Sequence, residues 1–503
     1  MLCYDSASRR ARDKRRNMIF KRCIPTGLGL VSLLYSSTSL AQQYDGKGAP
    51  AFIPHTLREA LAAAYLTNPT LQQERATLRA TDENVPAALA GWRPTIQGQA
   101  ALTYYQGRTS YGAQGPAPGS QFGSPAYNRV YNTPGYQGGV TITQPLYNGG
   151  KTSAATHQAV NTVMAERANL ISTEQQVFAS VVTAYVNVIR DEQLLQISIN
   201  NEHVLQEQVK ATQQRKALGE LTRTDVAQAQ VAFANATAVR QQAEGTLRSD
   251  QATYLQVVGL PAAPNLEAPQ PLALPVHSAT EAVKLAVENN PTVVNALFTE
   301  AQKKDAIGVA LAAIMPKVSA TAAYQRMTNQ GYGHMLSDNK YAMLNFQIPI
   351  YQGGSEYAAV RQARQAFEAA HRNVDIQRRT ALQLAEANWQ QLQSYQEAIG
   401  SERQAIAAGI VALDGVERQA IVGTSSTLEV LQQQATLLSA QQTLIQSLSN
   451  LVVASYGVAA AIGRLTAADL KLDVPLYDEK AYYNAVKDRL WGINDYAVNQ
   501  PGR

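Results

Sequence analysis

Apolar and polar residues alternate with a period of two in four segments of the chain: residues 95–105, 137–144, 317–325 and 341–348. The even-numbered positions carry the apolar side chains, among them Ile96, Leu102 and Tyr104 in the first segment. Because successive side chains of a strand point to opposite faces, each segment predicts a strand with one apolar face. Their lengths approach the about 9–11 residues of a membrane-crossing strand. An ordinary antiparallel sheet shows the same alternation, so this pattern alone leaves both interpretations open.

Residues 151–217 contain neither glycine nor proline, which predicts a helix about 100 Å long at about 1.5 Å per residue. A helix of that length indicates coiled-coil packing. A 4-3-4 spacing of apolar residues is typical of such packing, and it occurs at two places. The residues are Phe178, Val182, Tyr185 and Ile189, and, after Leu437, Leu444, Leu448 and Leu451. Packing on one side and water on the other suits either a structural coiled coil or a channel wall.

The chain is an internal duplication. Asn68-Pro69 recurs 222 residues later as Asn290-Pro291, and Gly219 recurs 204 residues later as Gly423. The shift from 222 to 204 indicates a longer loop in the first copy, at 106–135, than at 326–339 in the second. Each copy predicts a helix of about 30 residues, a β-hairpin and two long helices joined by a turn. The predicted organisation is residues 42–259 for repeat 1, 260–278 for a Pro-rich linker, 279–463 for repeat 2 and 464–503 for a C-terminal tail.

The N-terminal segment carries the positive charge of the chain. Residues 1–41 hold eight basic and two acidic residues, so the rest keeps 35 basic and 36 acidic ones. A basic stretch, a short apolar run and Ser39-Leu40-Ala41 predict a cleaved export signal, with Met18 as an alternative start. Nucleic-acid binding loses its main support, because the remaining chain is not basic. Cys3 and Cys23 both lie in this segment, which excludes disulfides and thiol chemistry from the mature chain.

Four strands cannot close a barrel, and an open sheet edge is not tolerated in lipid because its backbone groups stay unpaired. Other subunits must therefore cover the edges if the strands span a membrane. Three protomers give twelve strands and two give eight; both numbers occur in membrane barrels, and we favour the trimer.

The chain resembles the TolC-type outer-membrane efflux family over about residues 55–465. The resemblance rests on the duplicated Asn-Pro pairs, the glycine-centred helical turns and two strand-to-helix turns. Those last turns contain Pro145, Gly149 and Gly150 in one copy and Pro349, Gly353 and Gly354 in the other. The resemblance implies an α+β, mostly α, protomer that trimerises into a 12-stranded outer-membrane β-barrel continued by an α-helical barrel in the periplasm. It also implies a periplasmic adaptor and an inner-membrane pump of the RND or ABC type, in multidrug efflux or type I secretion. Drugs, other small molecules or unfolded proteins would be the cargo.

The same resemblance assigns roles to the two helical turns. It implies a periplasmic gate narrowed by acidic residues, at positions matched by Asp225 and Glu429. It further implies that the turns contact the adaptor, through Gly219, Leu221, Thr222, Gly423, Thr424 and Ser425. This sequence departs from the family pattern, because Gln432 replaces an acid and Ser425 replaces an arginine that helps to lock the closed state. The residues alone nominate five N-caps for the returning helices: Thr222, Thr224, Ser425, Ser426 and Thr427.

The candidate enzyme motifs in this sequence are incomplete. The Gly149-Gly150-Lys151-Thr152 segment is similar to the end of a phosphate-binding loop, but the motif requires glycine at position 145, which is proline. The six histidines are scattered without metal-ligand spacing. We therefore predict neither an enzyme nor a cofactor nor a metal site. The alternative function is a periplasmic coiled-coil or adaptor protein without a pore. Trp491 and Tyr482-Tyr483 in the tail are candidates to pack around the middle of the tunnel.

Overall fold

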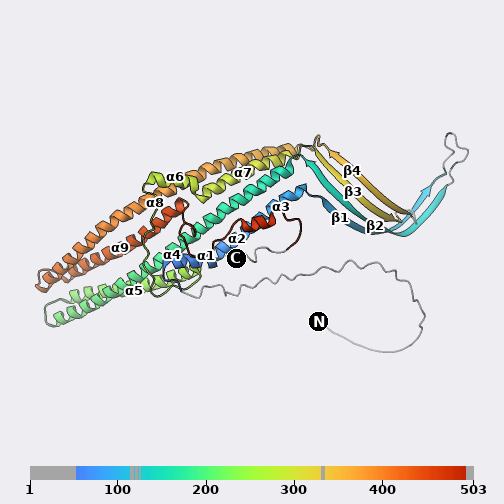
Figure 1. The fold of residues 1–503 in the computed structure, drawn as a ribbon. Coiled ribbons are helices and arrows are strands. Elements are labelled where there is room, and N and C mark those ends of the chain that lie inside the picture. Colours follow the sequence, from blue (N-terminus) through green and yellow to red (C-terminus); the bar gives the residue numbers. More distant parts are fainter. Residues whose placement is uncertain (1–52, 114–117, 119–122, 124–125, 330–334, 494–503) are drawn as a thin grey trace, which may run out of the picture. The chain divides into compact units, whose positions relative to one another are not determined.

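The structure is a computed structural model, and it describes residues 53–113, 118, 123, 126–329 and 335–493. The export signal predicted over residues 1–41 lies outside the described residues. Residues 49–503 form one compact unit. Helices and a single sheet make up this unit (Figure 1).

The sheet has four antiparallel strands in the order β1-β2-β3-β4. Its strands are β1 Thr95–Tyr111, β2 Tyr127–Asn148, β3 Lys317–Thr328 and β4 Leu336–Gln347. Even-numbered residues pair with even-numbered residues in most of each of the three ladders. Examples are Ile96↔Ile142, Ile142↔Ala322 and Ala320↔Leu344. The apolar positions of the four segments therefore share one continuous face. That face is open to the surroundings, with Leu102 82% and Phe346 67% exposed.

The hairpin loops predicted at 106–135 and 326–339 are too wide at both ends, although the connection is longer in the first copy, as predicted. The ladder between β1 and β2 continues to Tyr111↔Tyr127, and that between β3 and β4 to Thr328↔Leu336. Glycine, proline and tyrosine in these stretches suggested a loop, but backbone pairing with the neighbouring strand extends the strands beyond their alternating part. At the other end, Ile348 lies just outside β4, which ends at Gln347.

Two long helical hairpins follow the two β-hairpins. The first is made of α4, Lys151–Ala217, and α5, Arg223–Val258. The second is made of α8, Ser355–Ile421, and α9, Thr427–Ala461. Both α4 and α8 have 67 residues, so the length predicted for the first copy is confirmed and the second copy reproduces it.

The helix of about 30 residues predicted before each β-hairpin is divided. Before β1 the chain forms α1 Leu57–Thr67, α2 Pro69–Asp82, α3 Asn84–Leu89 and the 3-10 turn η1 Ala90–Trp92. Before β3 it forms α6 Ala279–Asn289 and α7 Pro291–Leu311. The Asn-Pro pairs explain the break: the asparagine takes an extended backbone and caps the next helix, and proline at the first helical position has no N–H to lose.

The main core forms where α1 and the linker pack against α4, α5 and α9. Phe178, Val182, Tyr185 and Ile189 are buried in it, as their spacing predicts. Tyr185 also donates its hydroxyl hydrogen to the backbone, with oxygen–oxygen distances of 2.8 Å to His55 and to Glu267. The leucine spacing in α9 is confirmed only in part: Leu451 packs against a buried cluster, but Leu448 is 36% exposed and the neighbouring Ile445 and Val452 are buried.

Residues 464–493, which we call the C-terminal strap, run back along α1, α2 and α4 and include the short helix α10, Ala481–Val486. The Tyr477 N–H donates to the Tyr65 hydroxyl at 3.0 Å, and the Tyr482 hydroxyl donates to Glu83 at 2.9 Å. The guanidinium of Arg167 lies 5.3 Å from the ring centre of Tyr483. Tyr482 and Tyr483 thus pack on the helices, whereas Trp491 stays 88% exposed.

The asparagine at each Asn-Pro break has two roles that one substitution removes together. Asn290 accepts from the Thr292 N–H at 2.9 Å and donates to the Ala461 carbonyl at 3.0 Å, and its side chain is buried. We expect Asn290→Ala to lower the free energy of unfolding by about 2 kcal/mol, from the lost cap and the lost tie to α9. Asn290→Ser keeps a cap but cannot bridge to Ala461, so it should fall between wild type and Ala.

Thermal unfolding of these variants, followed by circular dichroism, checks this prediction. Glu288→Ala, on the exposed side of α6, is the matched control and should leave the midpoint unchanged. An Asn290→Ala midpoint equal to wild type would show that neither bond contributes.

Candidate functional site

Both helical turns end the preceding helix in the same way. Gly219 and Gly423 have φ angles of 84° and 81°, a left-handed conformation that side chains other than hydrogen disfavour. The residue after each glycine donates its N–H back across the turn, from Glu220 to Arg215 at 3.0 Å and from Thr424 to Gln419 at 2.9 Å. These bonds satisfy carbonyls that the helix end would otherwise leave open. Gly219 and Gly423 therefore terminate α4 and α8.

Of the five candidate N-caps, the structure uses Thr222 for α5 and Ser426 for α9. In each turn the third helical residue is the acid singled out in the sequence. The N–H of Thr222 donates to Oδ2 of Asp225 at 2.8 Å, and the N–H of Ser426 donates to Oε2 of Glu429 at 3.0 Å. The hydroxyl of each cap accepts the N–H of the same acid in return, at 3.3 Å in both cases. Asp225 and Glu429 thus close two capping boxes.

The hydroxyls beside these acids favour their charged forms. The hydroxyl of Thr222, followed by its backbone N–H, lowers the pKa of Asp225 below its ordinary value of 3.8. The hydroxyl of Ser425 donates to Glu429 and, with the Ser426 N–H, lowers the pKa of Glu429 below 4.5. Ser425, which stands where the family resemblance suggests an arginine, therefore supports the neighbouring carboxylate. Both acids carry a full negative charge at neutral pH.

The sequence pattern did not identify Arg215 as a turn residue that joins the two hairpins. Its guanidinium pairs with Glu220 at 3.0 Å and also donates to the Ala420 carbonyl, at 3.5 Å, in the other turn. A basic residue in the last turn of α4 is the available signal, since cations favour helix C-termini. Around it the turns expose large apolar side chains, with Leu218, Ile421 and Val422 more than 70% exposed. Leu221 is half-buried, and Thr222, Gly423 and Thr424 are exposed.

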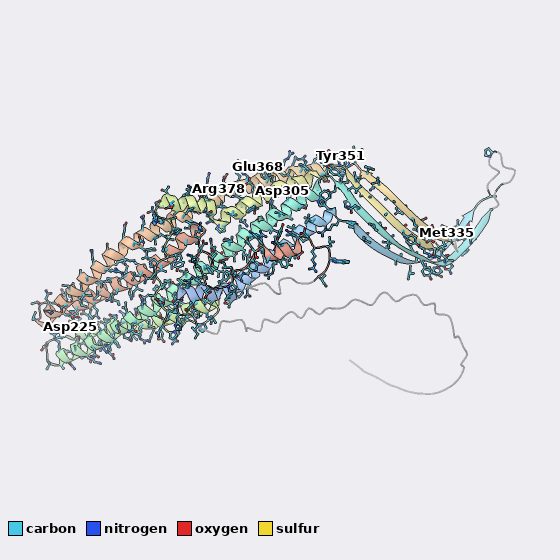
Figure 2. All side chains as sticks on the ribbon, in the orientation of Figure 1. Asp225, Asp305, Met335, Tyr351, Glu368 and Arg378 are labelled. Atoms are coloured by element: carbon cyan, nitrogen blue, oxygen red, sulfur yellow. The ribbon has the colours of Figure 1, made fainter. Side chains whose placement is uncertain are left out.

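The strand-to-helix turns form a second, separate cluster (Figure 2), with Tyr351 at one turn and Asp225 at the far end of the helical hairpins. Gly149, Gly150, Gly353 and Gly354 all have positive φ angles between 70° and 86°. A Cβ on Gly149 would lie 2.9 Å from the Ala312 carbonyl oxygen, so this position leaves no space for a side chain. Pro145 lies at a register shift in the pairing of β2 with β3. Pro349 follows β4, where no ladder N–H is required.

Within the described residues, no group of three or more histidine, cysteine or acidic side chains is arranged to hold a metal ion. One described helix, α9, is long and apolar enough to cross a membrane. It packs instead along α8 and α4, with part of its surface in the main core.

Residues 60–260 and 282–464 match the family described as outer membrane efflux protein. The chain is 32% identical over 485 residues to the outer membrane efflux protein BepC of Brucella suis biovar 1 (strain 1330), covering 95% of this chain and 98% of that protein. It is 23% identical over 487 residues to the outer membrane protein TolC of Escherichia coli (strain K12), covering 90% and 88%. The fold matches the crystal structure of the outer membrane protein VceC from Vibrio cholerae with a TM-score of 0.68 at 18% identity, over 81% and 96% of the two chains. Since the family match spans most of its length, the chain belongs to the outer membrane efflux protein family.

Proposed function

We propose that three copies of this chain form the outer-membrane exit channel of an efflux pump or a type I secretion system. The observation that carries this proposal is the four-stranded sheet with one continuous apolar face and two open edges, β1 and β4. In lipid the exposed apolar face is stable, but the open edges are not. Pairing β4 of one copy with β1 of the next, three times, closes a 12-stranded barrel without an edge. The long helical hairpins would then continue the barrel into the periplasm.

The remaining segments follow this plan. Residues 1–41 are the export signal, removed after Ala41, and residues 42–259 and 279–463 are the two repeats on either side of the 260–278 linker. Residues 464–503 stay on the periplasmic side. The exposed apolar face of the sheet counts against a periplasmic coiled-coil or adaptor protein, because such a face would be placed in water.

The two helical turns form the periplasmic end of the channel in this proposal. Three-fold symmetry brings together six carboxylates, from Asp225 and Glu429 of each copy. A ring of carboxylates favours cations over anions. Turn residues contact the periplasmic adaptor of an RND or ABC pump: Gly219, Leu221, Thr222, Gly423, Thr424 and Ser425. Drugs, other small molecules or unfolded proteins are the cargo classes.

Neutralising both acids tests the position of the gate without disturbing the turn. In Asp225→Asn/Glu429→Gln the side-chain oxygens still accept the cap N–H groups, since an amide also closes a capping box. We expect the double variant to lose most of its preference for cations, measured as the reversal potential of single channels in a salt gradient. Glu207→Gln, an exposed acid on α4 that pairs with Lys210, is the matched control and should behave as wild type.

An unchanged reversal potential in the double variant would place the selective constriction elsewhere. Absence of conductance from wild type and double variant alike, in folded trimeric protein, would contradict the channel itself.

The pH dependence follows from the lowered pKa values of the two acids. A carboxyl whose pKa is lowered by folding stabilises the turn fully above its ordinary pKa, and this stabilisation is lost as the pH falls through the lowered value. We therefore expect cation preference to stay constant from about pH 8 to about pH 5 and to decline only below the ordinary carboxyl range. Reversal potentials from about pH 8 to about pH 3 check this, and a loss of preference between about pH 7 and about pH 5 would show that repulsion within the carboxylate ring outweighs the hydrogen bonds of the turns.

A further inference from the structure

The helices beside the sheet lie in the same order as the strands. The segment α2–α3 precedes β1 and packs on α4, α4 packs on α7, and α7 packs on α8, which follows β4. At the sheet end of the helices, α2–α3 and α8 are therefore the two ends of the row, as β1 and β4 are the two ends of the sheet. In a closed ring the free side of α8 in one copy faces α2–α3 of the next.

Each end of the row presents large apolar side chains at the level where strands meet helices. On the β4–α8 side Ile350 is 88% and Tyr351 75% exposed. On the β1 side Trp92 is 46% and Trp491 88% exposed. The pairs Thr95↔Thr143 and Lys317↔Gln347 put the start of β1 and the end of β4 at the same end of the sheet. The two clusters therefore lie at matching heights on opposite edges.

The tip of the C-terminal strap is fixed at this level by hydrogen bonding. Arg93, two residues before β1, donates a guanidinium N–H to the carbonyl of Arg489 at 2.8 Å. Nearer the start of the strap, the Tyr482 hydroxyl donates a hydrogen bond to Glu83. The strap thus covers part of α2–α3, and Trp491, two residues after Arg489, is exposed rather than packed in the core.

Charges on the two edges are complementary. Arg361 and Arg364 are exposed on α8, about 9 and about 14 Å above its first residue. Glu83 and Asp488 are exposed on the other edge, and Glu83 lies about 14 Å above Trp92 along α3 and η1. Among the described residues none of these four charges has a salt bridge within the protomer. Opposite charges on the two edges select for a second copy of the chain, because an anionic lipid surface would attract Arg361 and Arg364 but repel Glu83 and Asp488.

We propose that the C-terminal strap is a subunit clasp. Trp92 and the strap tip with Trp491 cover Ile350 and Tyr351 of the next copy, while Glu83 and Asp488 face Arg361 and Arg364. The inference rests on the proposed trimer and assigns a role to a segment outside the barrel and the helical turns. The contact is head-to-tail, so each copy contributes a different surface to each of its two neighbours.

Paired cysteines test the clasp directly. In a full-length background with Cys3→Ser and Cys23→Ser, we would combine Trp491→Cys with Ile350→Cys and add a short bismaleimide cross-linker to the purified protein. The expected products have two and three times the protomer mass on denaturing gels. Each single variant should give no such products, because a head-to-tail contact places unlike residues together. Leu102→Cys with Ile350→Cys is the control pair, since Leu102 is exposed on β1, seven residues and about 23 Å beyond its first residue.

Light scattering of the same samples tests the trimer separately from the clasp. A trimer with no cross-linked products overturns the clasp and leaves the channel intact, and monomeric wild type in lipid overturns the proposed trimer. A Trp92→Phe/Trp389→Phe variant leaves Trp491 as the fluorescent residue. If brominated lipid quenches its fluorescence and the cysteine pair gives no cross-linked product, the strap tip lies at the membrane surface and the clasp is overturned.

Charge exchange provides an independent check should the cysteine pair prevent assembly. Arg361→Glu should lower the trimer fraction in dilute detergent at low salt, and added Asp488→Arg should restore it. A double variant no better than Arg361→Glu alone overturns the charge pairing on which the clasp depends.

Discussion

Unpaired backbone groups at the two edges of the sheet are the constraint from which the rest of the structure follows. Each buried N–H or carbonyl without a partner costs several kcal/mol in hydrocarbon, and β1 and β4 each present one open row of them. Duplication doubles a β-hairpin into four strands but cannot remove the edges. Only further copies of the chain can, and the row of helices continues the strand order so that the same closure extends below the sheet. As a member of a family of efflux proteins with this architecture, the chain is not an enzyme.

At the far end of the helices the physical problem is the opposite one, because the chain must reverse in water rather than in lipid. Glycine in the left-handed conformation ends one helix, and a hydroxyl with an acid three residues later begins the next. The same two carboxylates therefore hold the turn together and provide its charge. Capping explains why an acid is present at Asp225 and Glu429 even in a protein without a gate, so their charge and their geometry must be separated experimentally.

Features that depend on local sequence pattern could be predicted from the sequence. Features that depend on contacts with other segments of the chain could not. Period-two alternation located all four strands, and the lack of glycine and proline gave both ends of α4. The strands extend through glycine- and tyrosine-rich stretches because a neighbouring strand pairs with them, which no single segment reveals. Leu448 follows a coiled-coil spacing but stays 36% exposed, because it lines an open pocket between α4, α8 and the linker. Five hydroxyl residues were equivalent as caps until the glycine conformation fixed where each helix restarts.

The exposed apolar surface of the protomer distinguishes a channel subunit from a soluble coiled coil. Leu102, Phe346 and Ile350 are each more than 60% exposed, and they lie on or beside the sheet. These side chains can be buried either by lipid or by another copy of the chain, and different parts of the protomer need each of the two. The even-numbered face of the strands spans all four of them and can be covered only by a continuous apolar medium. Ile350 and Tyr351 lie at an edge, beside arginines, where a protein surface with carboxylates is the better match.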